Sequence, residues 1–120
     1  REVIIMRLDY INVAVEQKYI ALPITFTEED GGTEYTMKLR NLMRLEEAEQ
    51  TEIQALSAEM NEDQEIAEMR PLFRKFLTIL ADDKSLIEKF LKVVGDDIAI
   101  MAYVMEQYQE VTQAEKAVAS

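Results

Sequence analysis

The chain has 120 residues, of which 24 are acidic and 13 are basic, so its formal net charge is −11 at pH 7. It contains no cysteine and no histidine, which excludes disulfides, thiolate zinc sites, cysteine nucleophiles and a Ser-His-Asp triad. The shortage of lysine and arginine argues against direct binding to nucleic acid, because neutralising phosphates requires clustered basic side chains. A hydrophobic share of 48% is enough for one domain with a real core.

The first 40 residues are expected to form a β region of three or four short antiparallel strands. Residues 2–8 are rich in β-branched side chains, and residues 10–16 alternate between apolar and polar side chains. Pro23 lies within a third apolar segment and suits an edge strand or a strand break. Residues 33–39 alternate again. Because a lone hairpin is only marginally stable, this region should pack on helices.

The segment "FTEEDGGTEY" between the last two expected strands has two interpretations. Its acidic residues and glycines could form a calcium loop, but the ligands are adjacent rather than alternating, and the position of the final glutamate ligand is occupied by Leu39. Asp-Gly and Gly-Gly pairs between strands are typical of hairpin turns. The sequence therefore predicts a hairpin with Gly31 and Gly32 in its turn.

Residues 42–118 are expected to form about four helices, so the predicted fold is α+β in a single domain that spans residues 1–120. Residues 42–60 contain strong helix formers and neither glycine nor proline, which predicts one continuous helix. Asn61 is a candidate N-cap of the next helix. Pro71 either kinks that helix or begins a new one.

The clearest predicted helix covers residues 82–95, with Asp82 or Asp83 as its N-cap and Gly95 at its C-terminal end. The acidic pairs before and after this helix would lie roughly 18 Å apart, too far to share a metal ion. The Gly-Asp-Asp tripeptide at its end matches a metal-binding tripeptide of RNA-copying polymerases, but that motif lies between strands. A helix end followed by an Asp N-cap of the last helix explains the same residues.

Four glutamates near the start of the helical region form a candidate partner-binding site: Glu46, Glu47, Glu49 and Glu52. They are either a solvated helix face or a docking surface for a basic segment of a partner. No nucleophile–base pair and no set of metal ligands can be assembled, so we expect neither an enzyme nor a cofactor or metal.

The last helix carries a second candidate partner-binding set: Met101, Tyr103, Met105 and Tyr108. Methionine fills irregular cores and also lines adaptable apolar grooves, so both interpretations remain open. Apolar side chains lie on more than one face of this helix, which is typical of a helix that is buried or packs on another subunit. The sequence therefore favours a homo-oligomer.

The alternating strand in "DGGTEYTMKL" leads into "RNLMRLEEAEQTEI", and an acidic turn precedes the final helix in "LIEKFLKVVGDDIAIMAYVMEQYQEV". This order of elements, from about residue 24 to residue 112, resembles that of the small tail assembly chaperones of long-tailed bacteriophages. The resemblance implies a non-enzymatic protein of the host cytoplasm. It would bind the tape-measure protein, keep the long apolar helices of that partner soluble, and leave as tail tube subunits polymerise. The sequence also contains no apolar run long enough for a membrane span and no secretory signal, so we expect the protein to be neither in a membrane nor secreted.

An alternative hypothesis uses the acidic residues directly. The chain could be an inhibitor or nucleic-acid mimic that presents carboxylates to a basic groove of a target protein. The cluster of acidic residues between residues 44 and 70 favours this hypothesis, whereas the apolar character of the last helices argues against it.

Overall fold

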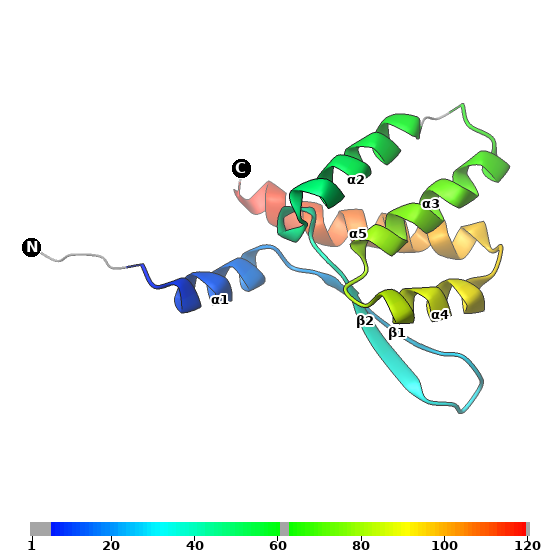
Figure 1. Ribbon diagram of the computed structural model, residues 1–120, viewed down its shortest axis with the longest axis horizontal. Coiled ribbons are helices and arrows are strands. Elements are labelled where there is room, and N and C mark those ends of the chain that lie inside the picture. Colours follow the sequence, from blue (N-terminus) through cyan, green and yellow to red (C-terminus); the bar gives the residue numbers. More distant parts are fainter. Residues whose placement is uncertain (1–5, 61–62, 120) are drawn as a thin grey trace, which may run out of the picture.

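The computed structural model describes residues 6–60 and 63–119, and within these ranges the chain is an α+β fold (Figure 1). Two strands and five α-helices lie in the described ranges, together with a short 3-10 helix at Leu42–Arg44. In chain order the elements are α1 (Leu8–Lys18), β1 (Leu22–Thr27), β2 (Glu34–Leu39), α2 (Glu47–Glu59), α3 (Ile66–Leu80), α4 (Lys84–Val94) and α5 (Ile98–Ala119). The predicted α+β class is confirmed, but the predicted numbers of three or four strands and about four helices were wrong.

The two strands form an antiparallel hairpin in which Leu22 pairs with Leu39 and Ile24 pairs with Met37. Met37 and Leu39 are buried, whereas the residues that alternate with them on β2 are exposed. The period of two in the sequence therefore correctly indicated the face of β2 that packs on the helices. Pro23 is tolerated because each strand of a two-stranded sheet has a free edge.

The connection between the strands is a β-turn, as predicted. The backbone N–H of Gly32 donates a hydrogen bond to the carbonyl of Glu29 at 2.9 Å. Gly31, the third residue of the turn, has a φ of 74°, which a residue with a side chain rarely adopts. Gly31 thus provides the positive φ, and Gly32 closes the hydrogen bond.

Helix α1 corrects the prediction that residues 10–16 form a strand. A strand in this position would need a neighbouring strand to satisfy its backbone, whereas a helix satisfies most of its N–H and C=O groups within the segment. Asp9 in the first turn and Lys18 in the last turn also favour the helix through its dipole. Residues 1–5, which include most of the first predicted strand, lie outside the described residues.

One predicted boundary in the helical region changes, and one open alternative is decided. Helix α2 begins at Glu47 rather than at residue 42, because Leu42–Arg44 form a 3-10 turn that is capped by the Asn41 side chain. The predicted N-cap Asn61 lies outside the described residues. Pro71 is the sixth residue of α3 and lies inside one continuous helix, so it does not begin a new one.

The caps of the last two helices follow the prediction. The Asp83 side chain accepts hydrogen bonds from the backbone N–H groups of Ser85 and Leu86, at 3.0 and 3.1 Å. Gly95 ends α4 with a φ of 62°. The Asp97 side chain then caps the start of α5. One acidic residue on each side of α4, Asp83 and Asp97, therefore serves as a helix cap.

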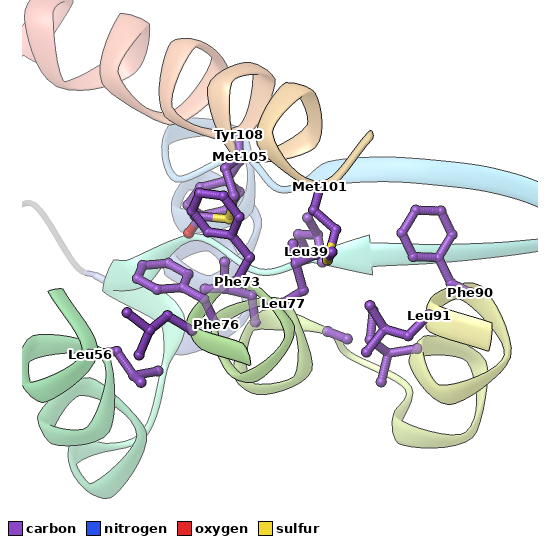
Figure 2. Close-up of a cluster of buried hydrophobic side chains, with 14 of the residues drawn as sticks. Leu39, Leu56, Phe73, Phe76, Leu77, Phe90, Leu91, Met101, Met105 and Tyr108 are labelled. Atoms are coloured by element: carbon purple, nitrogen blue, oxygen red, sulfur yellow. The ribbon is translucent and has the colours of Figure 1, made fainter. Parts of the chain in front are cut away.

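The buried side chains form one cluster, to which β2 and helices α2 to α5 contribute. Figure 2 shows the central part of this cluster, in which side chains of α3 such as Phe73 and Leu77 face Met101 and Met105 of α5. On the hairpin side, the ring of Phe26 packs edge-on against that of Phe90, with centroids 5.4 Å apart. This core fixes how α3, α4 and α5 lie against the hairpin.

The connection between α3 and α4 pairs with the end of β2. Ala81 forms an isolated antiparallel bridge with Leu39, and the N–H of Asp82 donates to the carbonyl of Lys38 at 2.9 Å. The Asp82 carboxylate accepts the N–H of Lys38 in return, at 2.9 Å. This short pairing anchors the helices to the hairpin.

Of the described helices, none is long and apolar enough to cross a lipid bilayer.

Candidate protein-binding surfaces

A groove that is open to solvent lies between α2 and α3 and has a volume of about 480 Å³. A cavity of about 150 Å³ accommodates one benzene-sized group, so this groove has room for about three such groups. Its apolar lining includes Leu56, which is buried, and Ile79, which is half-buried. The residues that line it are Glu52, Ala55, Leu56 and Glu59 of α2 and Arg74, Lys75, Thr78 and Ile79 of α3.

The two sides of this groove carry opposite charges. Glu52 and Glu59 lie on the α2 side, seven residues apart and therefore on one face of that helix. Arg74 and Lys75 lie on the α3 side. The Arg74 guanidinium donates to the carbonyl of Gly95 and lies 3.9 Å from the Asp96 carboxylate, so its charge is directed toward the turn between α4 and α5. The Arg74 guanidinium is thus held by that turn, and a segment in the groove would meet carboxylates along the α2 edge and the Lys75 ammonium along the α3 edge.

The four candidate glutamates of the α2 region do not form one surface. Glu47 and Glu52 are exposed, and Glu52 belongs to the groove. Glu46 and Glu49 form a capping box at the start of α2, in which the Glu49 carboxylate accepts the N–H of Glu46 at 3.1 Å. Two of the four residues therefore hold the helix start in place.

Glu49 is also fixed by an ion pair with Arg40. The guanidinium donates to both carboxylate oxygens, at 3.2 and 2.6 Å, and the two side chains are 27% and 22% exposed. The hydrogen bond from Arg40, followed by that from the Glu46 backbone, lowers the pKa of the Glu49 carboxyl. The ion pair favours the ionised form of Glu49 and joins α2 to the end of the hairpin.

Arg40 and Lys84 bind the carbonyl groups that the C-terminal end of α3 leaves without helical partners. Arg40 donates to the carbonyls of Ile79 and Leu80, at 2.6 and 3.2 Å. The Lys84 ammonium donates to three carbonyls in the same region, including that of Thr78 at 2.6 Å. Burial, and then the charge of Arg40, lower the pKa of Lys84. Cations are favoured at this end of a helix, so the arrangement stabilises the fold.

The candidate set on α5 divides between core and surface. Met101, Met105 and Tyr108 are buried, whereas Tyr103 is 62% exposed. The Tyr108 hydroxyl donates to the carbonyl of Arg40 at 2.7 Å, and burial raises the pKa of this tyrosine. Three of the four residues therefore belong to the core, as the core-filling interpretation predicted for the methionines, and they form no exposed stripe with Tyr103.

Helix α1 presents an exposed apolar surface that was not among the candidate sites predicted from the sequence. It extends away from the other helices, and none of its residues is buried (Figure 1). The side chains of Leu8, Tyr10 and Val13 are 71%, 66% and 54% exposed. Met6, Tyr10 and Val13 follow the spacing i, i+4, i+7, which was the available sequence signal for a helix with an apolar stripe.

Within the part of the chain that the structure describes, no group of three or more acidic side chains is arranged to hold a metal ion. Comparisons with protein-family models, with curated proteins and with solved structures found no match for this chain. The resemblance to phage tail assembly chaperones rests on the order of elements alone.

Proposed function

We propose that this protein is a non-enzymatic binding protein that shields an apolar helix of an elongated partner in phage tail assembly, such as the tape-measure protein. The observation that carries the proposal is the groove between α2 and α3, with its apolar lining and its oppositely charged edges. An amphipathic helix binds such a groove by placing its apolar stripe on the lining and its charged side chains along the edges.

The groove suits a helix better than a small ligand. It is open to solvent, and the charged residues that line it come from two different helices, Glu52 and Glu59 from α2 and Lys75 from α3. Helices α2 and α3 have 13 and 15 residues, so a bound helix could follow them for roughly 20 Å at 1.5 Å per residue. A partner with many similar helices would occupy many copies of the protein.

Two matched variants test the proposal in a co-expression experiment with the tape-measure protein of the same phage genome. Ala55→Glu places a carboxylate in the lining of the groove and should weaken co-purification at least tenfold. Gln54→Glu adds the same charge to an exposed position of α2 outside the groove and should leave binding unchanged. Equal binding by both variants would contradict the proposal, as would a gene position remote from tail genes.

The acidic inhibitor or mimic remains the alternative function, and the exposed carboxylates of Glu47 and Glu52 are the observation in its favour. Glu47→Gln, outside the groove, should weaken binding to a basic target, and higher salt should weaken it further. The groove variant Ala55→Glu should then have no effect. Glu46 and Glu49 are unsuitable for this test, because their replacement would disturb the start of α2.

A further inference from the structure

Among the residues that the structure describes, helix α1 packs on little that explains its stability, since only Ile11 and Val15 of its side chains are half-buried. It has 11 residues, and isolated helices shorter than about 12–15 residues are marginal in water. It contains three β-branched residues, Ile11, Val13 and Val15, which lower helix propensity further. None of its side chains is buried. A helix of this kind is ordinarily stabilised by packing its apolar face on another surface.

The exposed stripe of α1 has charges of opposite sign on its two sides. At about 100° per residue, Tyr10 and Val13 lie together on one face. Asp9, which pairs with Arg7 at 3.3 Å, and Glu16, seven residues later, lie along one edge of this face, and Lys18 lies along the other edge. The stripe therefore has an apolar centre, an acidic edge and a basic edge.

The groove between α2 and α3 complements this stripe in charge and in length. With α1 in the groove, Glu16 would face Lys75 of α3, and Lys18 would face the carboxylates of α2. At 1.5 Å per residue, α1 is roughly 16 Å long, which fits along helices of 13 and 15 residues. In the described part of the chain, therefore, the exposed face of α1 and the groove are both uncovered, and they match in length and charge.

We propose that α1 of one copy occupies the α2–α3 groove of a second copy, and that reciprocal exchange forms a two-fold dimer. Exchange of an identical element between protomers is a low-cost route to a closed dimer, because each copy supplies the surface that the other lacks. Neither apolar surface is then left exposed in the absence of a client. The dimer concerns the groove of the proposed function but does not depend on that function, since self-association is measurable without any client.

Light scattering on the full chain provides the first test. The wild-type chain should be a dimer, and Val13→Asp, which puts a charge at the centre of the stripe, should raise the dissociation constant at least tenfold. Asn12→Asp adds the same charge on a different face of α1 and should leave the dimer intact. A wild-type chain that remains monomeric at every concentration overturns the proposal, and so does an equal effect of the two variants.

Disulfide trapping identifies the contact itself, and the chain suits it because it has no natural cysteine. A mixture of the Val13→Cys and Ala55→Cys variants should form a mixed disulfide dimer under mild oxidation. A mixture of Val13→Cys with Gln54→Cys, on the exposed side of α2, should form far less of it. Equal yields in the two mixtures refute the contact. A disulfide formed within single chains of a Val13→Cys, Ala55→Cys double variant would show instead that α1 folds back on its own groove.

Discussion

Arg40→Ala should destabilise the fold more than any other single change of an exposed or half-exposed charge. The guanidinium makes a bidentate ion pair with Glu49 and donates to the carbonyls of Ile79 and Leu80. It therefore connects the end of β2 with the start of α2 and the end of α3. The variant removes all of these bonds at once and leaves the Glu49 carboxylate without its cation.

The size of the effect follows from the exposure of the pair. A hydrogen bond to a charged group contributes about 1.5–3 kcal/mol, and breaking a fully buried ion pair costs about 3–5 kcal/mol. Because the Arg40 and Glu49 side chains are 27% and 22% exposed, solvent screens part of this interaction. We expect the free energy of unfolding to fall by about 2 kcal/mol.

Urea unfolding of the full chain, followed by circular dichroism, measures this change. With a slope near 2 kcal/mol per molar urea, which is ordinary for a small domain, the midpoint should fall by about 1 M. Arg44→Ala removes an exposed arginine nearby and should shift stability by less than about 0.5 kcal/mol. In a double-mutant cycle, Glu49→Gln should cost little more once Arg40 is absent. Additive effects, or a stable Arg40→Ala variant, would refute the assigned role of this ion pair.

Three further changes test other parts of the structure. Tyr108→Phe leaves the carbonyl of Arg40 without its donor and should lower the free energy of unfolding by about 1 kcal/mol, whereas Tyr103→Phe, at an exposed position, should have no effect in the same urea assay. Because the folded-state pKa of Glu49 is lowered, its stabilising effect is present above its unfolded pKa of about 4.3 and is lost as pH falls through the folded value. Urea midpoints from pH 6 down to pH 3 should therefore fall more steeply for the wild-type chain than for Glu49→Gln. Gly95→Ala forces an alanine to a φ of 62°, which should lower the free energy of unfolding by about 1–3 kcal/mol and therefore also the melting temperature. An unchanged melting temperature would contradict the backbone geometry at this turn.

Local signals in the sequence predicted the hairpin and the later helix ends well. The alternation that ends at Leu39 and the glycines after Asp30 specify a strand and a turn within a few residues of each other. Asp83 and Gly95 mark the two ends of α4 in the same local way. These predictions held because the side chain or backbone that determines each feature lies inside the segment it describes.

The errors concern features that depend on distant contacts. Residues 10–16 alternate like a strand, yet no strand in the described fold is placed to pair with them, and the helix satisfies their backbone instead. Glu49 looked like part of an exposed acidic face, but Arg40, nine residues earlier, brings it into an ion pair. Tyr108 looked like an interface residue, and its hydroxyl contacts a carbonyl 68 positions away. No spacing rule within a helix reports such partners.

The strength of the proposed dimer can be bounded from the exposed side chains of α1. Full burial of one valine-sized or larger apolar side chain contributes about 1.5–3 kcal/mol. Tyr10 and Val13 are 66% and 54% exposed, so covering them in both copies gives a gross gain of at most roughly 6–12 kcal/mol. Association itself costs about 4–15 kcal/mol in lost freedom, and the charged edges add little because they are exposed. The net affinity should therefore be weak, near the micromolar range or above. A weak dimer is what shared use of the groove requires, since a client helix with a longer apolar stripe could displace α1 at ordinary concentrations.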